Sequence, residues 1–246
     1  MDKPRTWHAQ SIMSYAAANA KVKAMAAKAI QMEMSLDAGQ PASLGYPATG
    51  NLEDTELSIE EKQRLLNDAV TSICRYIQDK PLRDYINAIA ATDKDINFYL
   101  AQWKRAAKLG TQNKTALKHI LGTEIDITNI IWMYRLKKYH RIKGSATYGY
   151  LIPIRHRLSN DATRHMAEAA TIKALLEVVA QSPYGMAVQF TRVQSDWHGQ
   201  NTQPSYKRLS PEGQLVNAIS KHYQAAARRY PNSIAPVVAY LHRLKI

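Results

Sequence analysis

Two pairs of closely spaced acidic residues are the first places in this sequence to look for chemistry. Asp93 and Asp95 form one pair, and Glu124 and Asp126 form the other. Two neighbouring carboxyl groups could act as a general acid and a general base. Each pair, however, precedes an apolar helical pattern, and a carboxylate at the start of a helix interacts favourably with the helix dipole. We therefore interpret both pairs as structural and predict no catalytic residue.

The eight histidines and the single cysteine show no spacing that is typical of a metal site. The histidines never form HExxH and never cluster with Cys74, which by itself can build neither a zinc knuckle nor a disulfide. No glycine falls in a phosphate-binding loop, and no serine lies in a G-x-S-x-G elbow. The sequence predicts no metal, no cofactor and no enzyme activity.

The net charge of +13 is unevenly distributed along the chain. Residues 101–173 carry 14 Lys and Arg against 4 Asp and Glu, and residues 206–246 carry 7 against 1. These segments contribute +10 and +6, so the remaining residues sum to −3. Such a concentration indicates an anionic partner, which could be nucleic acid, an anionic membrane surface or an acidic protein face.

Tyrosines alternate with the cations in the most basic part of the chain. Cations for phosphates and aromatic rings for bases would suit a nucleic-acid surface. No helix-turn-helix, RRM or KH signature accompanies them, and the tyrosines could equally belong to contacts between helices. A basic helical nucleic-acid-binding protein is therefore the alternative function. The residues concerned are Arg135, Lys137, Lys138, His140, Arg141, Lys143, Arg155, His156 and Arg157, with Tyr134, Tyr139, Tyr148 and Tyr150.

Hydrophobic periodicity predicts an all-α protein with eight or nine helices. An Ala-rich N-terminal helix is expected within residues 1–36, and the Gly- and Pro-rich segment 37–57 is expected to be a loop. Segment 182–205 is ambiguous, with a short strand possible at 186–193. The other helices are expected at 58–78, 81–91, 95–109, 115–121, 126–141, 161–180, 211–229 and 234–246.

Capping residues and glycines set the expected helix boundaries. Ser58 stands three residues before a glutamate, which is the spacing of a capping box. Ser159 and Ser210 are expected N-caps, the second reinforced by the proline that follows it. Gly110 and Gly122 are expected to end the helices before them.

The predicted helix 126–141 has apolar residues on nearly every side, which is typical of a helix buried between neighbours. Its start also resembles the start of the helix at 95–109. Both place Asp-Ile first, then an asparagine, then an aromatic run that ends in basic residues. This similarity is as consistent with coincidence between two amphipathic helices as with an internal repeat.

No apolar stretch reaches the roughly 20 residues that cross a bilayer. The N-terminus lacks the apolar block and cleavage site of a signal peptide. We expect a cytoplasmic protein.

Three segments resemble the C/d subunit family of V-type and A-type rotary ATPases. The most specific is 122–139, GTEIDITNIIWMYRLKKY. Segment 15–25, YAAANAKVKAM, is similar to the N-terminal helix of the family, and 229–241, RYPNSIAPVVAYL, is similar to its closing motif. These segments occur in the order that the family has.

The resemblance implies a helical funnel of three related units and a single domain over residues 1–246. The chain stops at Ile246, inside the third unit, and 34–57 is shorter than the usual connection, so a shortened member is expected. The implied role is that of a non-catalytic socket between the central shaft and the membrane proteolipid ring during proton or sodium transport. The implied location is peripheral, on the cytoplasmic face of the membrane, with possible contact to anionic lipid headgroups.

The basic helix and the closing motif supply the residues that we predict to dock partners. They are Asn129, Arg135, Lys137, Lys138, Arg155 and Arg157, with Tyr240 and Arg243 in the later unit.

Overall fold

The computed structural model describes residues 58–90, 94–142, 144–185 and 210–245, and positions 17, 18, 20, 21 and 24. Apart from those five positions, the predicted N-terminal helix 1–36 lies outside the described residues, as do the predicted loop 37–57 and the ambiguous segment at 186–205. The described ranges contain helices and no strand, which confirms the all-α prediction. Their contacts group them into two compact units. The single domain predicted over 1–246 stays a prediction.

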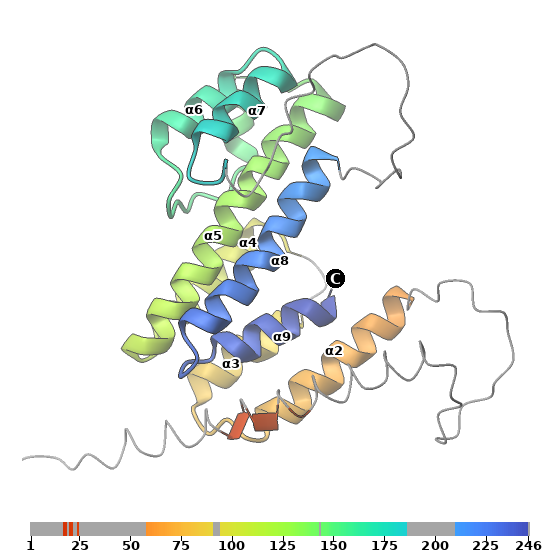
Figure 1. Cartoon of the computed structure of the whole chain (residues 1–246), viewed down its shortest axis with the longest axis vertical. Helices are drawn as coiled ribbons and strands as arrows, with labels where there is room; N and C mark the ends of the chain where they lie inside the picture. The colour runs from red at the N-terminus through yellow and green to blue at the C-terminus, as the bar shows by residue number, and fades with distance from the viewer. Residues whose placement is uncertain are drawn as a thin grey trace, which may run out of the picture. The chain divides into compact units, whose positions relative to one another are not determined.

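The first unit contains α2 (Ile59–Cys74), α3 (Lys80–Ile89) and α9 (Ala235–Lys245), and α2 packs against both of the others (Figure 1). The predicted capping box is confirmed at the start of α2. Ser58 Oγ accepts a hydrogen bond from Glu61 N at 3.2 Å, and Glu61 Oε2 accepts one from Ser58 N at 2.9 Å. Both bonds occupy backbone donors that the first helical turn cannot pair.

Side-chain hydrogen bonds hold the elements of this unit together. Gln63 Nε2 of α2 donates to the carbonyl of Ala90 at 2.9 Å, just after α3. Asn113, which is buried, accepts from Ile234 N at 3.0 Å, immediately before α9. The fully buried core includes Leu66, Ile73, Ile77, Leu82, Ile86, Val237 and Leu241.

Three helices, α4 (Ile96–Ala107), α5 (Thr111–Arg135) and α8 (Pro211–Arg229), contribute residues to both units. The predicted start of α8 is confirmed, since Ser210 Oγ accepts from Gly213 N at 3.1 Å. Asp95 caps α4 in the same way, because its Oδ1 accepts from Phe98 N at 2.7 Å.

The predicted break at Gly122 is wrong, because α5 runs continuously through it. A glycine inside a helix costs only about 1 kcal/mol relative to alanine. Every residue from 121 to 130 is buried, and that burial outweighs the cost. The prediction of a buried, all-round apolar helix is confirmed, but Glu124 and Asp126 lie in its middle. The predicted interaction of this pair with a helix start is therefore wrong.

The two Asp-Ile steps consequently occupy different positions in their helices. Asp95 precedes the first turn of α4, whereas Asp126 lies deep within α5. Their sequence similarity does not correspond to equivalent places in a repeated unit.

The C-terminal end of α5 continues as a single π-helical turn, η1 (Leu136–His140), and stops at Arg141, whose φ of 55° is left-handed. A 3₁₀ helix, η2 (Gly144–Tyr150), follows. The predicted end near residue 141 is confirmed.

The helix predicted at 161–180 is two helices, α6 (Asn160–Glu168) and α7 (Ile172–Gln181), which pack against each other (Figure 1). Ser159 caps the first, as predicted, and Thr171 Oγ1 accepts from Ala174 N at 3.1 Å to begin the second. Ala169 between them has extended ψ of 128°, which ends α6.

Candidate docking surface and its polar core

The middle of α5 buries an unusual number of polar side chains. Five of the ten buried polar residues of the described chain fall within residues 123–129, namely Thr123, Glu124, Asp126, Thr128 and Asn129. Burying a polar group is costly unless it is hydrogen-bonded. The partners of these side chains therefore explain how the second unit is built.

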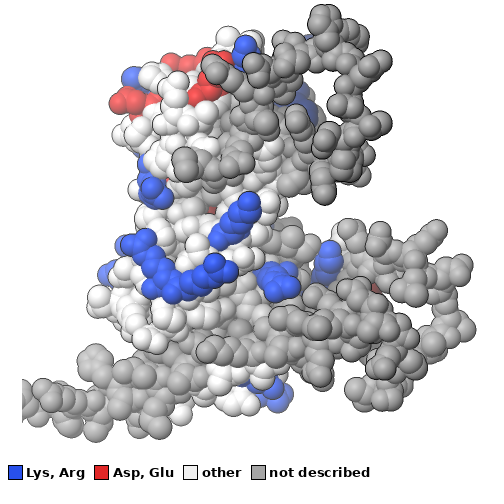
Figure 2. All heavy atoms as spheres, in the orientation of Figure 1, with Lys and Arg blue, Asp and Glu red and all other residues white. Residues whose placement is uncertain are grey.

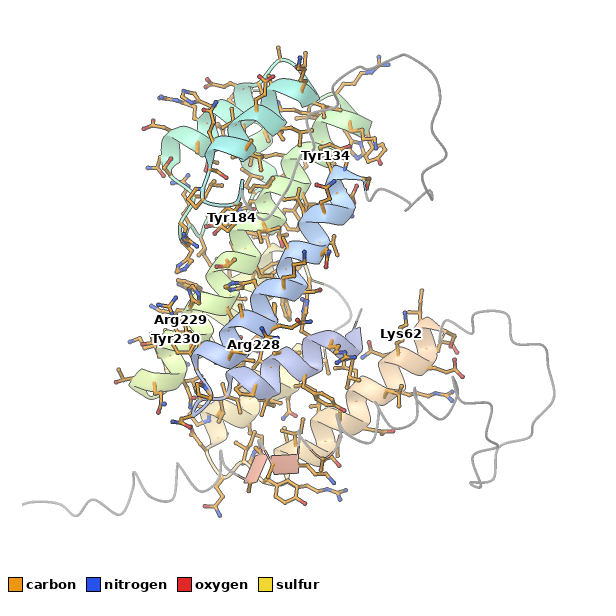
Figure 3. The ribbon with its side chains drawn as sticks, viewed as in Figure 1. Lys62, Tyr134, Tyr184, Arg228, Arg229 and Tyr230 are labelled. Atoms are coloured by element: carbon orange, nitrogen blue, oxygen red, sulfur yellow. The ribbon has the colours of Figure 1, made fainter. Side chains whose placement is uncertain are left out.

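Asp126 organises the loop after η2. Its carboxylate accepts hydrogen bonds from the backbone N–H groups of His156 at 3.1 Å, Arg157 at 2.7 Å and Leu158 at 2.9 Å. The hydroxyl of Tyr184, which follows α7 and is labelled in Figure 3, donates to the same carboxylate at 2.6 Å. Burial, and next the bond to Asp126, raise the pKa of the Tyr184 phenol. One side chain thus fixes two separate segments.

Glu124 lies at the centre of a second network. Its Oε1 accepts from Lys94 Nζ at 2.6 Å and from Tyr99 Oη at 3.2 Å, and its Oε2 accepts from Tyr223 Oη. Burial, and next the negative charge of Glu124, raise the pKa of the Tyr99 phenol. Residues from α4, α5 and α8 therefore meet at one carboxylate, which holds these helices together within the unit.

Asn129 belongs to this polar core and not to the surface. Its side chain donates to the carbonyl of Ile152 at 3.0 Å and accepts from the N–H of the same residue at 2.9 Å. The side chain is buried, so the prediction that it docks a partner is corrected. An apolar helix accommodates such an amide only where a backbone segment pairs with it.

The three cations at the end of α5 differ in their surroundings. Arg135 is exposed and forms an ion pair with Glu212 of α8, with Nε at 2.7 Å from Oε1. Lys137 donates to the carbonyls of Ala167 and Ala169 at 2.6 and 2.9 Å, and so caps the end of α6. Lys138 is exposed, and its Nζ lies 5.0 Å from the centre of the Tyr139 ring.

The remaining predicted docking residues are divided between the units. Arg155 and Arg157 are exposed in the second unit, and Arg155 binds Asn160 Oδ1. Tyr240 and Arg243 lie on α9 in the first unit, where the tyrosine is half-buried and the arginine is exposed. On the face that Figure 2 shows, acidic side chains gather over α6 and α7, while basic ones dominate elsewhere.

The second unit contains a cavity of about 350 Å³ that was not predicted from the sequence. Its wall is mainly apolar, and it is formed by Ile96 of α4, Trp132 of α5, Leu136 of η1 and Tyr150 of η2. The only sequence feature that marks this region is the alternation of aromatic and basic residues. This alternation does not indicate which aromatic rings line a cavity.

A family model described as the ATP synthase (C/AC39) subunit matches residues 46–246. The chain belongs to this family. The match includes the polar core, the basic end of α5 and α9. No curated protein and no solved structure matches the chain.

Gly122 lies within the residues that match the ATP synthase (C/AC39) subunit family. In the structure this glycine allows another segment to pack closely against α5. A Cβ atom at Gly122 would lie 2.5 Å from His156 Cγ and 2.7 Å from His156 Cβ. The position of His156 Cβ is fixed by the backbone, so relieving its contact would require the loop or α5 to move. The missing Cβ is therefore what lets the loop that Asp126 holds approach α5.

Gly122→Ala is expected to destabilise the protein by up to roughly 2 kcal/mol, because overpacking of about 1–3 kcal/mol is offset by a gain in helix propensity of about 1 kcal/mol. Urea unfolding followed by circular dichroism measures the change. Gly149→Ala is the control, since a Cβ there meets no atom within 4 Å. Adding His156→Gly, which removes both of these atoms, should recover part of the lost stability, and a double variant no more stable than Gly122→Ala would contradict the packing argument.

Three histidine rings meet beside this loop. The ring of His119 on α5 lies 5.6 Å from that of His156 and 5.0 Å from that of His222 on α8, centre to centre. Burial, and next the charge of His119, lower the pKa of His222 to about 4, and His156 and Arg157 add to the lowering. Burial also lowers the pKa of His156. The folded state therefore favours the neutral forms of His156 and His222.

The free energy of unfolding should fall by about 1–2 kcal/mol between pH 7.5 and pH 5 through His222 alone. An unfolded histidine titrates near 6.5, so the contribution of His222 is complete above that pH and is lost as the pH falls toward 4. Urea unfolding at several pH values measures it. His222→Gln should flatten the pH dependence, whereas His165→Gln, at an exposed position on α6, should leave it unchanged. Equal pH profiles for the two variants would refute the assignment.

Among the described ranges, no three His, Cys, Asp or Glu side chains converge in a way that could hold a metal ion. Within those same ranges, no helix is long and apolar enough to span a bilayer.

Proposed function

We propose that this chain is a non-catalytic socket subunit of a V/A-type rotary ATPase, which couples the central shaft to the membrane proteolipid ring during ion transport. The observation that carries the proposal is the family match over residues 46–246. In this proposal the chain is peripheral on the cytoplasmic face of the membrane, and its partners are shaft subunits, the ring and anionic headgroups near the ring.

The contacts inside the second unit support a docking role over a catalytic one. Glu124 and Asp126, the two buried acidic residues within the described ranges, are each held by at least three hydrogen bonds within the chain. Neither faces the cavity. A catalytic carboxyl group must reach a reacting atom, whereas these two groups hold helices and a loop together.

The exposed cations supply the surface. Of the predicted docking residues, Arg135, Lys138, Arg155 and Arg157 are exposed in the second unit, and so is Arg141. Arg135 is paired with Glu212. Lys137 is assigned to capping α6 instead, so its replacement would disturb the fold before it disturbed docking.

A pull-down of the tagged chain from solubilised host membranes tests the proposal. Recovery of shaft and proteolipid subunits is expected at moderate salt, and it should fall roughly tenfold in Lys138→Glu/Arg141→Glu, because rim charges mainly set association. Lys108→Glu, an exposed charge reversal on another part of the chain, is the control. Recovery of nucleic acid, released steeply by added salt, without any ATPase subunit would refute the socket role and favour the nucleic-acid alternative.

A further inference from the structure

The cavity of about 350 Å³ in the second unit has a preformed apolar wall. Ile96 and Trp132 each pack on one side against the buried cluster of Tyr99, Leu121, Ile125 and Ile152, and line the cavity on the other. Side chains fixed by a core lose little freedom when something binds to them. A cavity of this size, walled by apolar and aromatic groups, is within the range of ligand and side-chain pockets.

The π turn η1 shapes one side of this cavity. Its first and last residues, Leu136 and His140, both line the space, and the chain leaves the helix at the left-handed Arg141. Single π turns inside α-helices are frequent at functional sites. Here the turn presents one apolar side chain and one basic side chain to the same opening.

Exposed cations flank the cavity on the side of η1. Residues 127–160 contain seven Lys and Arg and no Asp or Glu. Arg135 and His140 line the cavity, and Arg135 is already paired with Glu212 of α8. Lys138 and Arg141, which neighbour these two residues in the sequence, are the exposed cations there. The one acidic residue of the lining, Asp95, has its carboxylate engaged by Phe98 N at 2.7 Å and Asn97 Nδ2 at 3.4 Å.

We propose that this cavity binds one large apolar side chain of a partner protein, and that Asp or Glu residues flanking that side chain bind the cations at the mouth. An open hollow with a fixed apolar wall can take a protruding side chain, and the exposed cations Lys138 and Arg141 suit acidic residues beside that side chain. Tyrosine, tryptophan and arginine together are also the residues most enriched at energetic centres of protein interfaces. The identity of the partner as a rotary-ATPase subunit rests on the proposed function. The kind of side chain that the pocket binds is argued from the pocket alone.

Gly149 offers a way to close the pocket without disturbing the fold. It lines the cavity, it is exposed, and a Cβ atom built on it meets nothing within 4 Å. Gly149→Leu should therefore fill the opening in an otherwise unchanged chain. Gly110→Leu is the matched control, because Gly110 is also exposed with nothing within 4 Å of its Cβ position and belongs to the other unit.

Photo-cross-linking of the full chain in host membranes tests the proposal directly. Tyr148, on η2 two residues before Tyr150 and 37% exposed, is replaced with p-benzoylphenylalanine. The same replacement at Tyr76, which is 44% exposed in the other unit, is the control. The expected product is one partner peptide with a large apolar side chain within a few residues of Asp or Glu. Gly149→Leu should lower its yield about thirtyfold, which corresponds to the loss of one central anchor, while Gly110→Leu should not.

The proposal is overturned if position 148 gives no protein product above the Tyr76 control, or only lipid or nucleic-acid products. A basic partner peptide, or a yield that Gly149→Leu leaves unchanged, also overturns it. If the unlabelled chain retains ATPase subunits but position 148 gives no such peptide, the pocket proposal fails and the socket role stands. If the peptide has the expected chemistry but comes from a protein outside the rotary ATPase, the pocket proposal stands and the socket role fails.

Discussion

Asp126→Ala is expected to lower the free energy of unfolding by roughly 3–5 kcal/mol, because it leaves several buried donors without an acceptor. The carboxylate accepts three backbone N–H bonds from residues 156–158 and one from the Tyr184 hydroxyl. Each unsatisfied buried donor costs about 1–3 kcal/mol, and relaxation of the loop toward water recovers part of that sum. Chemical unfolding followed by circular dichroism measures the loss.

In Asp126→Ala, the loop at 156–158 should also open locally under conditions in which the rest of the chain stays folded. Hydrogen exchange of the amides at 156–158 should rise strongly, and protease should cut near them at concentrations that leave wild type intact. Asp161→Ala is the control, since the Asp161–Arg164 pair is exposed and worth little. Tyr184→Phe should lose less, because it leaves three of the four bonds in place. Slow exchange at 156–158 in Asp126→Ala would show that this carboxylate does not hold the loop.

Helix starts in this chain could be predicted because the residues that decide them are adjacent in the sequence. Ser58 with Glu61, and Ser210 before Pro211, satisfy backbone donors within three positions of themselves. No contact from elsewhere in the chain is needed for these caps. The sequence therefore predicted the starts of α2 and α8 correctly.

The two wrong boundaries depend on residues far along the chain. Gly122 stays helical because it lies in the buried stretch 121–130 of α5, and His156, over thirty positions later, packs where its Cβ would be. The chain breaks after α6, where the carbonyls of Ala167 and Ala169 accept from Lys137. Local periodicity identifies neither His156 as the neighbour of Gly122 nor Lys137 as the donor at the end of α6. A helix end was therefore predicted at Gly122, where there is none, and the break between α6 and α7 was not predicted.

The basic residues of the candidate surface were visible in the sequence, but their use was not. The sequence shows that Arg135, Lys137 and Lys138 are close together. In the structure Arg135 pairs with Glu212, Lys137 caps α6, and Lys138 is exposed and contacts a tyrosine ring. Helical spacing alone cannot separate these roles. Asn129 was misplaced for the same reason, because its pairing with Ile152 is a tertiary contact.

Glu124→Ala is expected to cost about 3–5 kcal/mol, the range for removing one partner of a buried ion pair. The carboxylate is 3% exposed and holds Lys94 together with the hydroxyls of Tyr99 and Tyr223. Glu124→Gln keeps the shape and removes the charge, so it separates electrostatics from packing. We expect it to cost about 2–3 kcal/mol, because hydrogen bonds to a charged group are stronger than those to a neutral one.

A double-mutant cycle with Lys94→Met tests whether the charge pair itself matters. If Lys94 is held chiefly by Glu124, Lys94→Met/Glu124→Gln should be more stable than the sum of the single losses predicts, by about 1–2 kcal/mol. Additive losses would mean that the two tyrosine hydroxyls carry the network and that the lysine is incidental. In either case the carboxylate joins α4, α5 and α8, which explains how the second unit tolerates an ionised group among its buried helices.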